Sequence, residues 1–560
     1  MGTIIIMTVV AILLGLTVVA GLAAALGRQQ ISEDYFQAGR SLPWYVVACS
    51  VAGLSLRLDM WLGLLGLTCA AGVAAGGLAW GSFVGLTVLS GVFLPYFLRK
   101  RVSSPAEFLE RRYSPATRNV FALLSILFLV LGVLVPALYV GGWVLSEAGF
   151  QVPPTMSTRC PTANGIPWIF FACVAAVAVL SSLAGVLGGS MAGAWSGAVQ
   201  FLVIAIGGTI FAVVATHDAG GLASVWEKNS PAQTVLLLSS RHNVLPWVGL
   251  VAFALTIGFW NTAVSPLTVG RCLGARSEWD ARLGAIVGGL LLLVLPAIFI
   301  LPGLAATGKL VSLGNNGLSA EAEASGLRLI ENLFGRQNPL GAAGQGLVVA
   351  AILAAVMNSV AAAVHAVSTL WTMDVGQGLL GRNDSESELV ARGRRSSLTT
   401  IIVATLLAPL LLAWDQGVFS YVLEASAIIG PPAAVVFLVA FFWPGVHGRS
   451  AVATLISGCL VGAALWLIVA CAEAEVMPKW LMPVVTRAGV TGLASLVLLG
   501  LFTFVIPQSS DELYDPDAAW SLDLATLPPQ EREAGSGLGN LLFWWGLLFV
   551  ALIAVWIVLR

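Results

Sequence analysis

The sequence predicts an all-α polytopic membrane protein with about fourteen transmembrane helices. Hydrophobic residues make up 58% of its 560 residues, charged residues only 10%, and the mean hydropathy is +0.92. This composition excludes an ordinary soluble domain. Apolar segments lie near 3–26, 44–72, 76–98, 119–147, 167–186, 194–216, 245–268, 283–308, 344–374, 399–414, 419–443, 451–472, 485–506 and 538–559. Most exceed the roughly 20 residues that a helix needs to cross ~30 Å of hydrocarbon.

The basic residues alternate between successive loops of this series. Seventeen of the 27 Lys and Arg residues fall in every second loop, nine fall in the other loops, and Arg57 lies inside a segment. Because basic short loops stay in the cytoplasm, the richer set predicts the cytoplasmic side. Fourteen spans then place both termini on the extracytoplasmic side of the plasma (inner) membrane.

Two apolar segments are interrupted near their middle. Segment 44–72 carries Gly53, Ser55, Arg57, Asp59 and Gly63, and segment 245–268 carries Gly258, Asn261, Thr262, Ser265 and Pro266. Broken helices at matching positions in two halves are typical of the midplane site of a secondary transporter. Glycines and prolines scattered through ordinary spans are the alternative interpretation.

The interruptions predict two inverted five-helix repeats in a transport core. The expected boundaries are a first helix and cytoplasmic loop (1–43), the core (44–443, divided into 44–216 and 245–443), and peripheral helices with an acidic cytoplasmic loop at 507–537 (444–560).

Several functions find no support in the sequence. No G-x-x-x-x-G-K-[ST] phosphate loop is present, so ATP-driven transport is unsupported. The net charge of −1 gives no sign of a nucleic-acid partner. An intramembrane enzyme would need a nucleophile with a base, or a metal set, and no such cluster of residues stands out. We therefore expect no cofactor other than a coupling ion.

Four motifs in order resemble the sodium:solute symporter family, which includes the sodium/glucose cotransporters. They are "DYFQAGRSLPWY" (34–45), "SPAEFLERRYSP" (104–115), "GRCLGARS" (270–277) and the apolar run 346–374 that ends in Thr372, Met373 and Asp374. The resemblance implies a leucine-transporter-type inverted-repeat fold. It also implies alternating access driven by a sodium gradient.

The resemblance implies a sodium site between the first broken helix and the segment 344–374. By motif position, the carbonyls fall on Gly53, Leu56 and Ala355, and the two hydroxyl positions fall on Asn358 and Ser359. One hydroxyl has become an amide, whose carbonyl oxygen can still coordinate a hard monovalent ion. The alternative is that Asn358 and Ser359 only bond the backbone or a neighbouring helix. Gly197 stands where some members carry an aspartate for a second cation, so we expect one coupled ion.

The positions that contact sugar in the family's sodium/galactose members are altered in this chain. Polar residues of those members are replaced by Met60, Ala79, Gly258, Leu292 and Leu423, and a gating tyrosine is replaced by Asn261. Each buried hydroxyl without a partner costs ~1–3 kcal/mol, so these changes argue against a hexose bound in the familiar pose. The full set of expected substrate positions is Arg57, Asp59, Met60, Ala79, Ser82, Gly258, Asn261, Leu292, Leu423 and Glu424.

Two further residues in the membrane are polar or charged. Arg57 should face a cavity or pair with an acid. It could bind a substrate anion, or it could form a closed ion pair with Asp59 and also Glu424. His365 lies on roughly the same helical face as Asn358 and could relay protons or serve only in packing.

We interpret the chain as a secondary active transporter, sodium-coupled, for a small organic solute. The partners expected are that solute, sodium and the lipid bilayer, with no nucleic acid and a monomer as the working expectation. The alternative is an uncoupled facilitator or a non-transporting sensor built on the symporter fold.

Overall fold

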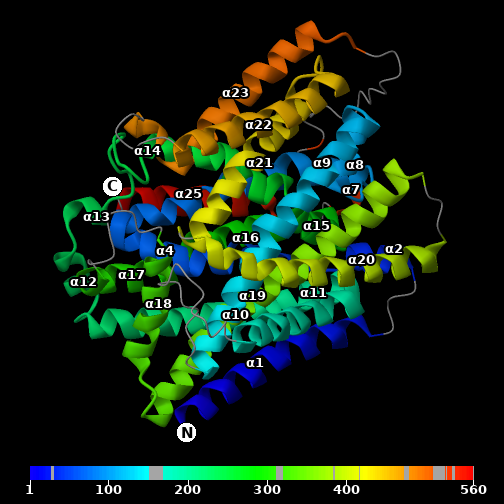
Figure 1. Ribbon diagram of the computed structural model, residues 1–560. Helices are drawn as coiled ribbons and strands as arrows, with labels where there is room; N and C mark the ends of the chain where they lie inside the picture. Colours follow the sequence, from blue (N-terminus) through cyan, green and yellow to red (C-terminus); the bar gives the residue numbers. More distant parts are fainter. Residues whose placement is uncertain are drawn as a thin grey trace.

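The computed structural model describes residues 1–26, 31–150, 168–310, 319–381, 385–414, 416–471, 478–508, 524, 526–531 and 537–558. These residues form helices, and their one extended pairing is a single bridge between Leu42 and Ala275. Within them, 11 helical stretches are long and apolar enough to cross a membrane, and Trp44–Ser55 and Leu541–Ile557 are shorter apolar helices. The predicted all-α membrane fold is confirmed (Figure 1), while the number of crossings stays a prediction.

Every apolar segment predicted from the sequence is helical over most of its described length. The first half holds α1 (Gly2–Ala25), α3 (Trp44–Ser55), α4 (Leu58–Ala71), α5 (Gly77–Trp80), α6 (Ser82–Val88), α7 (Leu94–Arg99), α9 (Pro115–Phe128), α10 (Val135–Phe150) and α11 (Trp168–Asp218). The second half holds α14 (Trp247–Phe253), α15 (Pro266–Leu273), α16 (Glu278–Val294), α17 (Ala297–Leu310), α19 (Pro339–Thr369), α20 (Glu386–Leu407) and α21 (Val418–Phe442). The peripheral helices are α22 (Gly448–Cys471), α23 (Val484–Val505) and α25 (Leu541–Val558).

Shorter helices and irregular turns connect these spans. The loop helices are α2 (Ser32–Gln37), α8 (Pro105–Arg112), α12 (Leu222–Lys228), α13 (Pro231–Thr234) and α18 (Ala320–Phe334). Wider π-helical turns are η3 (Leu89–Phe93), η4 (Leu129–Leu134), η5 (Ala254–Gly258), η6 (Trp260–Val264) and η8 (Leu370–Leu379). Tighter 3₁₀ turns include η1 (Ala38–Arg40), η2 (Gly72–Gly76) and η9 (Ala408–Ala413).

Both predicted interruptions are present. In the first segment, α3 stops at Ser55, and the chain passes through Leu56 (φ −94°, ψ 45°) and Arg57 (φ −59°, ψ 159°) before α4 begins. In the second segment, the π-helical turns η5 and η6 precede an extended residue, Ser265 (φ −59°, ψ 128°). Pro266 explains this position, because the residue before a proline is driven out of the helical region. The break thus falls at Ser265 rather than at Gly258 or Asn261.

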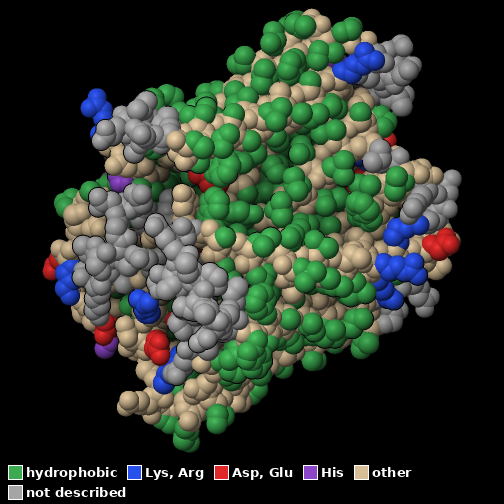
Figure 2. All heavy atoms as spheres, viewed as in Figure 1, with side chains coloured by type: hydrophobic (Ala, Val, Ile, Leu, Met, Phe, Trp, Pro, Cys, Tyr) green, Lys and Arg blue, Asp and Glu red, His purple; other side chains and the backbone are tan. Residues whose placement is uncertain are grey.

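The alternating loops meet at two opposite ends of the bundle. At the end that we name the basic face, Ser32 N donates to Glu386 (2.7 Å), Trp44 N donates to Asp280 (2.9 Å) and Arg99 Nε donates to Glu278 (2.8 Å). At the other end, the opposite face, Gln233 Nε2 donates to the Cys69 carbonyl (3.2 Å) and Asn229 Nδ2 to the Leu304 carbonyl (3.1 Å). Figure 2 shows charged side chains mostly at two edges of the molecule, with a band of hydrophobic and uncharged atoms between them.

Part of the predicted acidic loop at 507–537 also lies on the basic face. Glu531 accepts hydrogen bonds from the backbone N–H groups of Glu278 (3.2 Å) and Trp279 (2.7 Å). These are among the first N–H groups of α16, which a helix cannot pair internally, so a carboxylate stabilises them. Residues 509–523, 525 and 532–536 of that loop lie outside the described residues.

Helix α21 is held by a charged side chain at each end. At its N-terminus, Glu323 of α18 accepts hydrogen bonds from Val418 N (3.0 Å) and Phe419 N (2.7 Å). At its C-terminus, Arg112 of α8 donates to the Ala440 carbonyl (2.7 Å) and the Trp443 carbonyl (2.8 Å). The acid at the N-terminus and the base at the C-terminus both complement the helix dipole. The two loop helices therefore fix α21 from opposite faces of the bundle.

The helical stretch labelled α11 turns back on itself at Gly189. This residue has φ 59° and ψ −152°, a conformation that glycine adopts readily, and a Cβ there would lie 2.5 Å from the Tyr35 carbonyl oxygen. Before the turn, Gly185 packs against Ala361 of α19. After it, Gly207 packs against Leu347 and Ala351 of the same helix. Both arms of α11 therefore line α19, and the second arm carries Gly197 to the middle of the bundle.

Candidate functional site

The end of α3 meets α19 at Gly53 and Asn358. A Cβ placed on Gly53 would lie 2.6 Å from Asn358 Nδ2, so the amide fills the space that this glycine leaves. Helix α3 stops at Ser55, and the Leu56 N–H closes it by donating to the Ala52 carbonyl (3.2 Å), so the regular bonding pattern ends beside Gly53. The interruption and the amide are thus brought together, as the resemblance implied.

Asn358 also contacts the second arm of α11 at Gly197. A Cβ on Gly197 would lie 2.7 Å from Asn358 Oδ1 and 3.2 Å from Ser50 Oγ. Ser50 and Asn358 are both 0% exposed. Within the described part of the chain, Ser50 Oγ and both polar atoms of the Asn358 amide have no hydrogen-bond partner. Since a buried polar group without a partner costs about 1–3 kcal/mol, this polar cluster calls for a ligand or a water molecule.

The other predicted sodium ligands lie next to this cluster. Ser359 Oγ donates to the Ala355 carbonyl (3.0 Å), a bond to the preceding turn of its own helix that leaves the hydroxyl lone pairs available. Ser50 was not among the residues predicted from the sequence. It stands three residues before Gly53, one helical turn away on the same face of α3.

Several predicted substrate positions lie where α6 packs against η5. Thr262 Oγ1 donates to the Ser82 carbonyl (3.3 Å), and a Cβ on Gly258 would lie 2.8 Å from the Gly81 carbonyl oxygen, so Ser82 and Gly258 pack together. Ala79 and Leu292 are buried near this contact, and Trp80 Nε1 donates to the Leu293 carbonyl (3.1 Å). Asn261 lies in η6 and accepts from Thr268 Oγ1 through its carbonyl (3.0 Å). Leu423 and Glu424 lie beside a large cavity, which Leu78 also lines.

Arg57 sits in the first interruption itself, as the N-cap residue of α4, and is 8% exposed. The side chains of Asp59 and Met60 lie outside the described residues, so a pair between Arg57 and Asp59 stays a prediction. Glu424, which we had suggested as a third member, pairs with Arg487 of α23. Arg487 is one of the nine basic residues that we assigned to the other loops, although it lies at the start of the predicted segment 485–506. That loop assignment is wrong, because the residue is buried in the first turns of α23.

A cavity of about 620 Å³ lies at the opposite face and ends at this ion pair. Its lining includes Leu67, Leu78, Ser420, Leu423, Glu424 and Arg487. The rim segment 243–245 is fixed by His242, whose Nδ1 accepts from Val244 N (3.3 Å) and Leu245 N (3.1 Å). Burial lowers the pKa of His242, which keeps the ring neutral at pH 7 and able to accept both bonds.

The basic face holds a much smaller pocket of about 40 Å³, with Ser104, Arg271 and His365 in its lining. His365 Nε2 donates to the Phe36 carbonyl (3.2 Å), and its ring packs 5.7 Å from that of Tyr35. These contacts support the packing interpretation of His365 over proton relay. The cavity at the opposite face is thus much larger than the pocket at the basic face.

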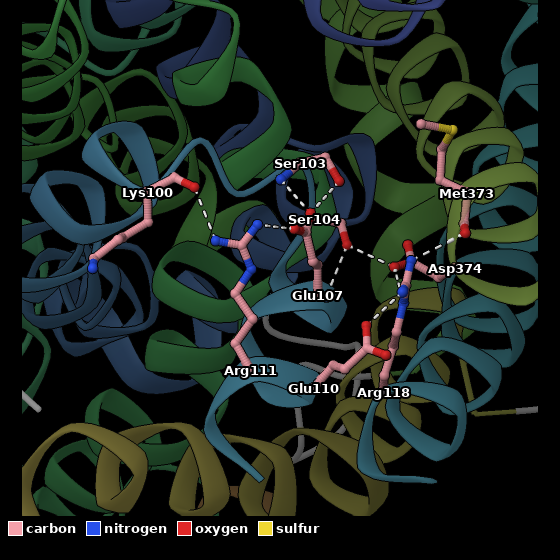
Figure 3. A network of polar contacts seen from close by, with 9 residues as sticks. All are labelled: Lys100, Ser103, Ser104, Glu107, Glu110, Arg111, Arg118, Met373 and Asp374. Atoms are coloured by element: carbon pink, nitrogen blue, oxygen red, sulfur yellow. Dashed lines mark hydrogen bonds and ion pairs between the residues drawn. The ribbon is translucent and has the colours of Figure 1, made fainter. Parts of the chain in front are cut away.

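Two of the motifs that carry the resemblance meet on the basic face (Figure 3). Asp374, the last residue of Thr372–Met373–Asp374, accepts from Ser104 Oγ (2.8 Å) and from Arg118 Nε (2.8 Å). Arg118 also donates to the Met373 carbonyl (3.0 Å) and to Glu110 (2.5 Å). This network joins α8 and the start of α9 to η8, the π-helical continuation of α19.

We expect an Arg118→Ala variant to be destabilised by about 3 kcal/mol, because it leaves the fully buried Asp374 carboxylate without its cation. Thermal unfolding of the detergent-purified protein measures the effect. Arg111→Ala is the matched control, because the Arg111 side chain is about one-third exposed where it pairs with Glu107. The loss of this pair should lower the stability by about 1 kcal/mol or less. Equal melting temperatures for both variants would contradict the structural role of the network.

Comparison with known proteins gives the family context of this geometry. The model of the sodium:solute symporter family matches residues 35–458. The sodium/glucose cotransporter of Vibrio parahaemolyticus is 26% identical over 444 residues, covering 76% of this chain and 78% of that protein. Sodium/glucose cotransporter 4 of Danio rerio is 25% identical over 486 residues, covering 80% and 70%.

A solved structure shares the fold. The substrate-bound outward-open structure of a Na⁺-coupled sialic acid symporter matches with a TM-score of 0.71 at 18% identity, covering 90% of this chain and 99% of that one. This likeness confirms the predicted leucine-transporter-type fold.

Proposed function

The chain belongs to the sodium:solute symporter family, and we propose that this sodium-coupled symporter moves a small organic solute other than a hexose, with one sodium ion in each cycle. Members of the family are transporters rather than enzymes. Sodium is the coupling ion of the family, and no other cofactor is indicated. We propose a monomer as its oligomeric state.

The observation that carries the proposal is the unpartnered polar cluster at the interruption of α3. Carbonyls from the end of α3, the Asn358 amide oxygen and the Ser359 hydroxyl are neutral oxygen ligands. Such ligands at an unwound helix suit a hard monovalent cation. Two conformations of the bundle that differ in their contacts with this ion would couple its binding to alternating access.

A solute other than a hexose fits the residues at the substrate positions. Ala79, Leu292 and Leu423 are buried and apolar, and Gly258 is packed against Gly81. A sugar would leave several hydroxyls without partners there, at about 1–3 kcal/mol for each. The solute would enter through the cavity of about 620 Å³, past the pair of Glu424 and Arg487.

For the orientation, we propose that the basic face is cytoplasmic, in the plasma (inner) membrane, because basic loops remain inside. Figure 1 shows both chain ends on the side of α12, α13 and α18, which would then be extracytoplasmic. The wide cavity would open to the outside, and the pocket of about 40 Å³ would be the closed inner end. The described conformation is then outward-facing.

Uptake of a solute panel into proteoliposomes under an inward sodium gradient, with potassium in its place as the control, tests the proposal. We expect one or more non-sugar solutes to accumulate only with sodium, and glucose and galactose not to accumulate. Accumulation of glucose would contradict the proposal that the solute is not a hexose. Uptake that does not depend on the sodium gradient would indicate a facilitator, and no uptake of any solute would indicate a sensor.

A further inference from the structure

Arg271 of α15 is a buried cation that forms no ion pair with a carboxylate in the described part of the chain. The residue is 4% exposed. Its Nη1 donates to the Ser190 carbonyl (3.2 Å), whereas Nη2 is buried and has no hydrogen-bond partner among the described residues. A buried charge is strongly unfavourable unless it is paired and hydrogen-bonded, so this guanidinium needs a counterion.

Other buried arginines of the chain have the partners that Arg271 does not have. Arg112, which is 2% exposed, donates to three backbone carbonyls at the C-terminal end of α21. Arg282, which is 5% exposed, pairs with Glu278 of its own helix (3.2 Å). Burial of an arginine is thus balanced elsewhere in this protein by an acid or by several carbonyls, and Arg271 stands out with a single carbonyl.

The carboxylates on this side of the bundle are already paired with other cations. Asp374 accepts from Ser104, which lines the same pocket as the buried guanidinium, but its ion pair is with Arg118 (2.8 Å; Figure 3). Glu107 pairs with Arg111. The acids near the pocket therefore balance the charges of their own arginines, and the counterion has to come from solution.

The pocket of about 40 Å³ at the basic face offers the place for this counterion. Arg271 and Ser190 both line it, together with Gln37 of α2 and His365 of α19. Its volume exceeds the roughly 10–15 Å³ that one water molecule needs, and it is far below the ~300–1,000 Å³ of pockets for organic ligands. One small inorganic ion fits this space, and the positive charge of Arg271 selects an anion.

We infer that this pocket binds one small monovalent anion such as chloride, with Arg271 Nη2 as its hydrogen-bond donor. The anion neutralises the guanidinium and lies between α2, α15, α19 and the loop before α8, so it stabilises the contacts that these elements make at the basic face. The basic loops of this face raise the local concentration of anions and favour its entry. This inference goes beyond the proposed function, since it adds an ion that is neither the solute nor sodium.

Equilibrium binding of ³⁶Cl⁻ to the purified protein, with sodium gluconate as the background salt, tests this inference. We expect one chloride ion per chain, displaced by bromide but not by gluconate, which is too large for the pocket. Arg271→Gln should weaken chloride binding about tenfold or more, because it removes the charged donor. Arg111→Gln is the control, because it removes a cation of the same face that pairs with Glu107 outside the pocket, and it should bind chloride like the wild type.

Gly270→Leu separates loss of the anion from a folding effect of Arg271→Gln. Gly270 lines the pocket, and a Cβ there would meet no atom within 4 Å, so the added side chain keeps the arginine and takes up the space of the ion. This variant should melt like the wild type in gluconate and should lose chloride binding.

Thermal unfolding gives a second measurement of the same site. When chloride replaces gluconate at constant sodium, the melting temperature of the wild type should rise by about 2–4 °C and then level off, because the anion binds only the folded protein. Neither Arg271→Gln nor Gly270→Leu should show this rise. Absence of ³⁶Cl⁻ binding to the wild type, with water alone solvating Arg271, would overturn the inference. Wild-type chloride affinity in both variants would overturn it as well, because the anion would then be bound elsewhere.

Discussion

Replacing Arg487 with alanine is expected to destabilise the protein by about 3–5 kcal/mol, because it leaves Glu424 buried without its cation. Arg487 is 5% exposed and Glu424 9%. Arg487 Nη1 donates to Glu424 Oε2 at 2.9 Å, and Nη2 donates to Oε1 in a second bond. This bidentate ion pair joins α21 of the core to the peripheral helix α23 at the cavity of about 620 Å³.

Thermal unfolding in detergent measures this effect, and a double variant separates the pair from its members. Glu424→Leu with Arg487→Leu removes both charges and should recover most of the stability that Arg487→Ala loses. Lys479→Ala is the control, because Lys479 lines the same cavity but is exposed, and should change the stability by about 0.5 kcal/mol or less. An Arg487→Ala variant as stable as the wild type would contradict a buried, closed pair.

Replacing Asn358 with alanine is expected to have the largest effect on transport. The change removes an oxygen that contacts Gly197 and that we propose as a sodium ligand. Loss of a hydrogen-bonding or ligating group of this kind costs about 1.5–3 kcal/mol, which corresponds to an increase of about 10- to 100-fold in the sodium concentration for half-maximal uptake. Solute uptake into proteoliposomes, measured over a range of sodium concentrations, gives this value.

Asn358→Ser tests whether the oxygen, rather than the shape of the amide, matters. Serine restores the hydroxyl that the family resemblance implies at this position. The sodium concentration for half-maximal uptake should therefore rise by about tenfold at most. Ser181→Ala is the control, because that serine is also buried but donates to the Val177 carbonyl of its own helix (2.6 Å). If Asn358→Ala kept the sodium dependence of the wild type, Asn358 would be a packing residue, and the ion would be bound elsewhere.

Local sequence patterns predicted the helices and the two interruptions. The apolar segments are long enough to require helices, and Pro266 alone places the second break at Ser265. Gly53 and Ser55 in an apolar segment indicated the first break, which the structure places at Leu56 and Arg57. Those features are determined by residues that are close together in the sequence, so they could be predicted from it.

Features that depend on distant partners could not be predicted in this way. Arg487 looked like a loop residue because Glu424, which makes its burial tolerable, lies 63 residues away in the sequence. The importance of Ser50 depends on Gly197 and Asn358, which reach it only through the turn of α11 and the path of α19. A serine within an apolar span has no sequence signal that separates a ligand from a self-satisfied hydroxyl.

Simultaneous measurement of ²²Na⁺ and labelled-solute uptake into the same proteoliposomes tests the central claim most directly, with a solute taken from the panel. Coupled symport with a single cation site predicts that one sodium ion enters with each solute molecule, and that Asn358→Ala reduces both fluxes together. Solute entry without ²²Na⁺ entry would contradict sodium-coupled symport by this protein.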